Sequence, residues 1–239
     1  ARCMRVGFRN APTRGQQQAR CGGGGMIYDL GGFVLSLALL LGYHGYLRLR
    51  LRDDPGYTVR EVARNTRVLW VETVMSSDER GVLAVQTLRN SVMAASFMAS
   101  TAILLMIGTL TLSGTAHSAG IWHNLNIGNA HGDLLTIKLI LLLADFFVAF
   151  FCFSMAVRFF NHVGYMVNVP RAARDKTLTP VHVAAYLNRA GDYYAYGMRP
   201  FFFCVSLVFW LFGPHFMLAA MAVLLAGLYY LDRAPCAGT

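Results

Sequence analysis

Two long apolar stretches, from Ser91 to Leu112 and from Leu134 to Val157, constrain this chain more than any other feature. About 20 residues of α-helix match the hydrocarbon thickness of a bilayer, so each stretch is long enough to cross a membrane. The segment that joins them contains no Lys or Arg, whereas the segments on their other sides are rich in Arg. Because basic residues stay on the side of synthesis, the pattern predicts a multipass membrane protein with the joining segment outside.

The asymmetry in basic residues also predicts an orientation. Fourteen Lys and Arg lie in residues 48–89 and 158–199, and none lies in residues 113–133. We therefore expect both Arg-rich segments on the inner side, the N-terminus outside and the C-terminus inside. A bacterial inner membrane and an organellar inner membrane fit the pattern equally well. Residues 1–25 depart from it, because they carry five Arg and no acidic residue.

Two further apolar regions bring the expected number of transmembrane helices to about five. The first runs from Met26 to Leu47, and the last, from Asp192 to Leu231, is too long for one crossing. Gly213 and Pro214 divide the last region, which predicts a hairpin with an outer turn, or else one long kinked helix. The predicted fold is therefore an all-α, polytopic helical membrane protein.

The domain organisation follows from the short loops. Residues 26–233 form a single helical membrane domain, since no loop is long enough to hold a core of its own. Residues 1–25 are a basic, Gly-rich N-terminal tail, and residues 234–239 are a C-terminal tail. The N-terminal tail can be a remnant of an organellar targeting sequence, a disordered segment or sequence upstream of a natural start at Met26.

One or two interfacial amphipathic helices are expected beside the spans. From Thr58 to Met75, apolar and small residues recur at helical spacing while Arg60, Arg64 and Arg67 occupy the other side. A basic amphipathic helix next to a span lies in the membrane interface. Ser77 and Asp78 end this helix. A further helix then starts near Glu79 and continues into the second span.

Other boundaries are read from caps and charges. Ser113 with Gly114 marks the end of the second span, and Arg158 marks the end of the third. Thr179 followed by Pro180 is typical of a helix start, and predicts a short helix to about Asn188.

Polar residues at the inner membrane border form the first candidate site. Neighbouring antiparallel helices bring the inner ends of the second and third spans to one depth, where they can form a polar collar. Its role is a gate or an anionic-ligand clamp, or else an interfacial anchor that binds lipid phosphate. The collar residues are Arg89, Asn90, Arg158, Asn161 and Trp70, with Glu72 as an alternative to Trp70.

Asp145 is the second candidate, because an ionised carboxylate in mid-membrane is costly unless it is paired or protonated. We expect it to face the bundle interior and to pair with Arg199, about two turns inside the fourth span. Lys138 lies two turns toward the outside, where its side chain can extend to the surface. A stripe of small residues on the second span predicts helix packing. The stripe consists of Ala95, Ser96, Ala99 and Ser100.

No catalytic, cofactor or metal site is predicted. Asp133 accompanies His117, His123 and His131 in the outer loop, and His215 lies at the outer hairpin, but the spacings match no metal-ligand motif. His44 and His162 lie too near the membrane border for a haem pair. The net charge of +9 follows the membrane topology, so we expect contact with anionic lipid headgroups and not with nucleic acid.

Several strings resemble a multipass membrane family of bacteria and plants, domain of unknown function 599. They are Trp70-Val-Glu-Thr-Val-Met, Gly81 to Ala94 with Leu88-Arg-Asn-Ser-Val-Met inside it, Arg158-Phe-Phe-Asn161 and Phe212-Gly-Pro. The resemblance covers residues 26–232 and implies a membrane protein, but no activity.

These patterns favour a non-enzymatic accessory or scaffold subunit that packs against other membrane proteins or against copies of itself. The alternative function is a small oligomeric transporter or channel with Asp145 on its pathway. A membrane enzyme is a third possibility, for which no nucleophile with a base and no phosphate loop is found.

Overall fold

Helices account for all the regular structure in the part of the chain that the computed structural model describes, residues 14–53, 59–77, 81–119, 132–170 and 178–231. In chain order the helices are α1 (Arg14–Asp53), α2 (Val59–Met75), α3 (Gly81–Ala119), α5 (Gly132–Val167), α6 (Pro180–Trp210) and α7 (Pro214–Leu231). The all-α prediction is confirmed.

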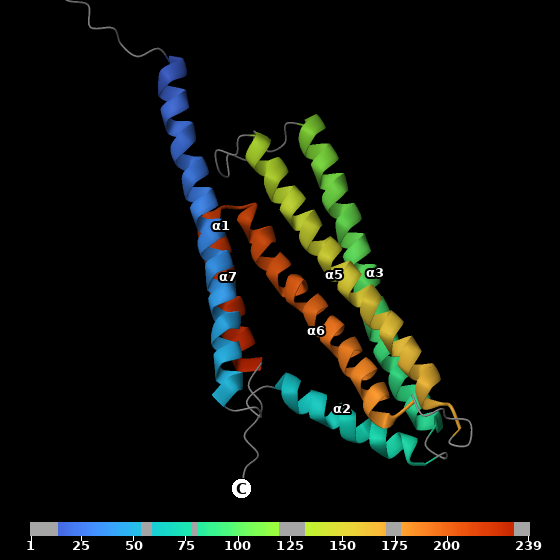
Figure 1. Cartoon of the computed structure of the whole chain (residues 1–239). Coiled ribbons are helices and arrows are strands. Elements are labelled where there is room, and N and C mark those ends of the chain that lie inside the picture. Colours follow the sequence, from blue (N-terminus) through green and yellow to red (C-terminus); the bar gives the residue numbers. More distant parts are fainter. Residues whose placement is uncertain (1–13, 54–58, 78–80, 120–131, 171–177, 232–239) are drawn as a thin grey trace, which may run out of the picture.

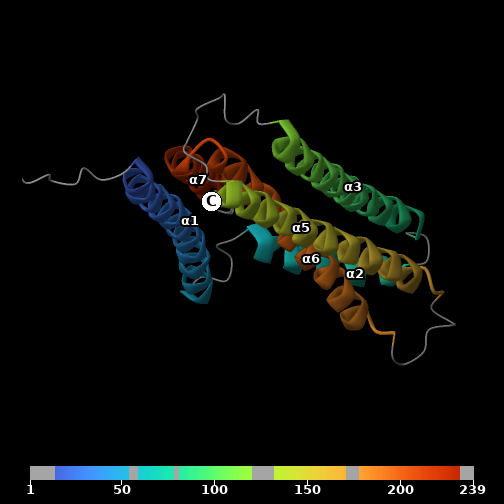
Figure 2. The ribbon, with the colours of Figure 1, turned by 90° about the horizontal axis from the view of Figure 1, so that it is seen from above.

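Three long helices, α3, α5 and α6, form the body of the molecule, with α5 between the other two (Figure 1). The short helix α2 lies across one end of this body, and α7 returns beside α6 from the other end. Helix α1 runs along α7, on the far side of the molecule from α3 (Figure 2). We call the end that carries α2 the basic end and the end with the α6–α7 turn the hairpin end.

Within the described residues, three helices are long and apolar enough to cross a membrane: Tyr28–Leu47 within α1, Gly81–Gly114 within α3 and Leu134–Val167 within α5. Helix α7 is a shorter apolar helix over Pro214–Tyr230. These four segments overlap four of the expected spans. Helix α6 carries Asp192 and Arg199 in its apolar half.

The predicted division at Gly213 and Pro214 is present as a turn between two helices, and not as a kink. Gly213 has a φ of 142°, in the region that favours glycine. Its N–H donates to the carbonyl of Trp210 at 3.2 Å, and Pro214 begins α7 with a ring that presets the helical φ.

Several helices continue beyond their predicted ends, and the ends predicted at Arg158 and Asn188 are wrong. Helix α1 begins at Arg14, inside the predicted tail. Helix α3 continues to Ala119, but its membrane-length apolar segment ends at Gly114, as predicted. Helix α5 passes Arg158, and α6 starts at the predicted Thr179 cap but continues past Asn188. A helix that has nucleated adds one hydrogen bond for each residue it fixes, so the membrane border alone does not stop it.

The largest buried cluster lies at the basic end, where α2, α3, α5 and α6 meet. Helix α2 contributes Val71, Val74 and Met75, whose side chains are buried within this cluster. Small residues let α3 approach α5: Ala95, Ala99 and Ala102 are buried. Within the predicted packing stripe, Ser96 is half-buried and Ser100 is exposed.

Candidate functional site

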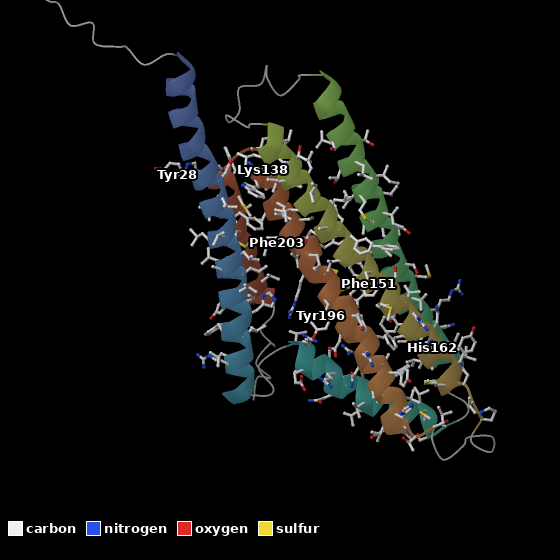
Figure 3. The ribbon with its side chains drawn as sticks, turned by 45° about the horizontal axis from the view of Figure 1, so that its top comes forward. Tyr28, Lys138, Phe151, His162, Tyr196 and Phe203 are labelled. Atoms are coloured by element: carbon white, nitrogen blue, oxygen red, sulfur yellow. The ribbon has the colours of Figure 1, made fainter. Side chains whose placement is uncertain are left out.

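Lys138 holds three helices together near the hairpin end. Its side chain is only 5% exposed, and its Nζ lies 3.1 Å from Asp29 Oδ2 of α1. The same Nζ donates to the main-chain carbonyl of Trp210 at 3.1 Å and lies 5.0 Å from the centre of the Trp210 ring. The expectation that Lys138 extends to the surface is therefore wrong. Figure 3 shows Lys138 among α1, α5 and α6 near the upper end of the bundle.

The positions of Trp210 and Asp29 in their helices explain why both can bind Lys138. Trp210 is the last residue of α6, and terminal carbonyls lack an intrahelical donor. Phe33, one turn after Asp29, stacks on the Trp210 ring with centroids 4.9 Å apart. Gly32 lies so close to Pro214 that an added Cβ would be 2.9 Å from the Pro214 Cβ. Close packing of α1 on α7 thus positions the Asp29 carboxylate.

Asp145 lies two turns from Lys138 on α5, and its carboxylate is partly buried. The Oδ2 atom is buried and accepts no hydrogen bond from the described residues. The expected pair with Arg199 is not formed; the Arg199 guanidinium instead lies 5.7 Å from the centre of the Tyr196 ring. Burial of Asp145 therefore agrees with the interior position expected from the sequence, but the predicted partner is wrong.

Two Arg of α2 attach this helix to α6 at the basic end. Arg60 donates to Asp192 Oδ1 from Nη2 at 2.6 Å and from Nε at 3.2 Å. Its guanidinium also lies 4.9 Å from the centre of the Tyr196 ring. Arg67 Nη1 donates to Asn188 Oδ1 at 3.1 Å, one turn along α6. These contacts fix both the position and the direction of α2.

The surroundings shift the pKa values of the Arg60 and Arg67 guanidinium groups in opposite directions. Burial tends to lower the pKa of Arg60, but Tyr196 and Asp192 outweigh burial and raise it. Burial lowers the pKa of Arg67, since its hydrogen-bond partner Asn188 is neutral. Both groups remain cations at any physiological pH.

The side of α2 that points away from the bundle exposes apolar residues and hydroxyl groups, next to Asn65 and Glu72. Val62 and Leu69 are exposed there. The hydroxyl of Thr66 donates to the Val62 carbonyl at 2.9 Å, and that of Thr73 donates to the Leu69 carbonyl at 2.7 Å. Hydroxyls satisfied within their own helix are suited to an apolar surrounding.

Two cavities lie on the surface of the bundle. One, of about 590 Å³, lies between the basic-end parts of α3 and α5 and is lined by Arg89 and Asn161 among mainly apolar residues. The other, of about 500 Å³, lies on the seam of α1 and α7.

The predicted collar residues therefore do not form one site. Arg89 and Asn161 share the first cavity, whereas Asn90 and Arg158 are exposed outside its lining. Trp70 packs against the basic-end cluster.

The candidate metal ligands give no site in the part of the chain described. No group of three or more His, Cys, Asp or Glu side chains is gathered among the described residues. His123 and His131 lie outside the described residues, as do the side chains of His117 and Asp133. His162 lies near the lower end of α5 in Figure 3.

Comparison with known proteins gives a family and no activity. No curated protein and no solved structure matches the chain. A family model described as "Protein of unknown function, DUF599" matches residues 32–236, which is most of the chain. The resemblance found in the sequence is thereby confirmed, and the chain belongs to the DUF599 family.

Proposed function

We propose that this protein is a non-enzymatic integral membrane protein of about five crossings that acts as an accessory or scaffold subunit. The outward face of α3 supports a partner-binding role. Phe97 and Leu104 on this face are 71% and 68% exposed. Ser100 and Gly108 lie beside them, and small residues leave recesses that the side chains of another membrane helix can fill.

The distribution of polar contacts supports the same role. Three polar contacts among the described residues each join two helices of this chain: Lys138 with Asp29, Arg60 with Asp192 and Arg67 with Asn188. These side chains serve the architecture of the bundle, and none of them has a geometry that suggests bond-breaking chemistry. The exposed faces then remain for lipid and for partners.

We further propose that the basic end faces the cytoplasm, matrix or stroma, with the N-terminus outside and the C-terminus inside. Arg60, Arg67, Arg89 and Arg158 all lie toward the basic end. Helix α2 then lies in the inner interface, with Val62 and Leu69 toward the acyl chains. Such an orientation places the positive charges beside anionic headgroups. A bacterial inner membrane or an organellar inner membrane suits this arrangement.

Copurification tests the accessory role. The tagged protein is extracted from its native membrane in mild detergent, and the proteins that accompany it are identified and counted. We expect a stoichiometric membrane-protein partner. Gly108→Leu should lower the amount of copurified partner, because it fills a recess on α3. An added Cβ at Gly108 meets no atom of this chain within 4 Å.

Gly227→Leu is the matched control, because Gly227 on α7 is equally open and lies away from this face. A pure homo-oligomer, unchanged by Gly108→Leu, would contradict the accessory role.

A small oligomeric transporter or channel is the second candidate, and one observation favours it. Asp145 Oδ2 is buried without a donor among the described residues, and a costly, unpaired carboxylate within a membrane span marks a candidate functional site. Under this proposal Asp145→Asn folds normally and abolishes ion flux in reconstituted vesicles. Equal flux in the variant and the wild type would exclude a role of this carboxylate in transport.

A further inference from the structure

We infer that the cavity between the basic-end parts of α3 and α5 binds one anionic phospholipid, whose phosphate lies on Arg89 and whose acyl chain follows the apolar wall. This site goes beyond the proposed accessory role and does not depend on a protein partner. We call it the α3–α5 cavity.

The size of the α3–α5 cavity suits part of a lipid. Its volume is about 590 Å³, within the range of sites that hold small organic ligands. Leu88 of α3 and Phe160 of α5 form its floor, and both belong to the buried basic-end cluster. Arg89 and Asn161 directly follow these two residues, so they lie at nearly the same depth on opposite walls.

Arg89 is available to an anion. It forms no hydrogen bond or ion pair with a described residue, and neither does Asn161. Asn168, the other amide in the lining, already donates to the Gly164 carbonyl at 2.6 Å. Arg89 and Asn161 can thus donate to the oxygens of one phosphate and its ester group, a geometry for which a guanidinium is well suited.

Within the described parts of α3 and α5, no acidic side chain lies near the cavity. Helix α3 contains no Asp or Glu, and Asp145 of α5 is about 24 Å along the helix from Asn161. Arg158 adds a second positive charge just outside the lining. An anion therefore complements this site, whereas a zwitterionic headgroup would bring its own cation close to Arg89.

The lining favours a phospholipid over a free anion. Val85 and Val92 line the cavity as an apolar wall beside the guanidinium, on helices that are long and apolar enough to lie in a membrane. Tyr165, 80% exposed at the edge of the cavity, has the amphipathic ring that prefers the headgroup level. A free phosphate would contact Arg89 and leave this apolar surface uncovered.

Native mass spectrometry of the purified full chain tests the site. The protein is exchanged into detergent and titrated separately with phosphatidylglycerol and with phosphatidylcholine. We expect one tightly retained phosphatidylglycerol in the wild type, and about a tenfold or greater loss of its affinity in Arg89→Gln, because a charge-assisted hydrogen bond is lost. Phosphatidylcholine binding should be weaker and unaffected by this change.

Gly164→Leu tests the shape of the cavity without a change in charge. Gly164 lines the cavity, and an added Cβ there meets nothing within 4 Å, so a larger side chain at this position extends into the cavity space. It should lower phosphatidylglycerol affinity as Arg89→Gln does, with an unchanged thermal midpoint. If Arg89→Gln folds poorly, Gly164→Leu still tests whether the lipid binds in the α3–α5 cavity.

Arg64→Gln is the control, since it removes the same charge from an exposed position on α2 at the basic end, outside the lining. Equal losses in Arg64→Gln and Arg89→Gln would show only general attraction to a basic surface and would overturn the proposal. Full binding in Gly164→Leu would do the same. Displacement of the lipid by millimolar inorganic phosphate would show that a free anion, and not a phospholipid, is the ligand.

Discussion

At the scale of the residue, Lys138 carries a buried charge that its partners must compensate. We expect Lys138→Met to lower the free energy of unfolding by about 3–5 kcal/mol, because it leaves the Asp29 carboxylate with no cation in a largely buried position. The carbonyl of Trp210 tolerates the change, since it also accepts from the N–H of Gly213. Thermal unfolding in detergent measures the loss.

The double variant Asp29→Asn with Lys138→Met separates charge from packing. It should recover a large part of the loss, because no uncompensated charge remains. A double variant as unstable as Lys138→Met alone would mean that Lys138 stabilises the bundle by packing and by its bond to Trp210, and not by its pairing with Asp29.

The sequence identifies such residues more readily than it identifies their partners. Lys138 and Asp145 stand out because charges are rare inside apolar runs, and Asp29 stands at the outer end of the first run. The pairing depends on which helices lie side by side. Nothing in the sequence around Lys138 shows that α1 brings Asp29 next to it. The one signal in the sequence is that both residues lie near the predicted outer border of the membrane.

At the scale of the element, one glycine decides how closely α6 approaches α5. An added Cβ at Gly197 would lie 2.9 Å from the ring of Phe153, which is fully buried. Gly197→Ala should therefore destabilise the protein by about 1–3 kcal/mol, because the ring has no room to move. Gly227→Ala on α7 is the control: its Cβ meets nothing, so the better helix propensity should be neutral or stabilising by up to about 1 kcal/mol.

The contact of α2 with α6 can be tested in the same way. Arg60 and Asp192 are 36% and 26% exposed, so water screens their attraction. A double-mutant cycle of Arg60→Gln and Asp192→Asn should give a coupling energy of about 1 kcal/mol or less. Amide exchange in α2 should rise in each single variant. Unchanged exchange in both variants would mean that the apolar face with Val71 and Val74 holds α2 without help from its charges.

For elements, the centres of the helices were predictable and several ends were not. Apolar runs give the centres because burial in lipid or protein requires them. The ends depend on capping. The predicted cap at Thr179 is confirmed, since its hydroxyl accepts from the His182 N–H at 3.3 Å. Asn188, by contrast, continues the helix, because its side chain binds Arg67 of α2 and does not cap the backbone.

At the scale of the whole molecule, the turn at Gly213 and Pro214 predicts that α6 and α7 cross the membrane as a hairpin, and the charge asymmetry predicts its direction. The part of α6 from Asp192 to Trp210 is about 28 Å long, enough to span the hydrocarbon core. His215, exposed just after the turn, and Arg64, exposed on α2, should then lie on opposite sides. Labelling tests this in a variant without its native cysteines: Cys3, Cys21, Cys152, Cys204 and Cys236.

In sealed vesicles with the outer side exposed, an impermeant maleimide should label His215→Cys at once, and Arg64→Cys only after the membrane is opened. The physical reason is that a maleimide with a fixed charge does not cross the bilayer, while the basic residues around Arg64 hold α2 at the inner headgroups. Labelling of both sites from one side would mean that α6 and α7 do not form a membrane-crossing hairpin. The proposed position of α2 would then have to be argued from its apolar Val62 and Leu69 face alone.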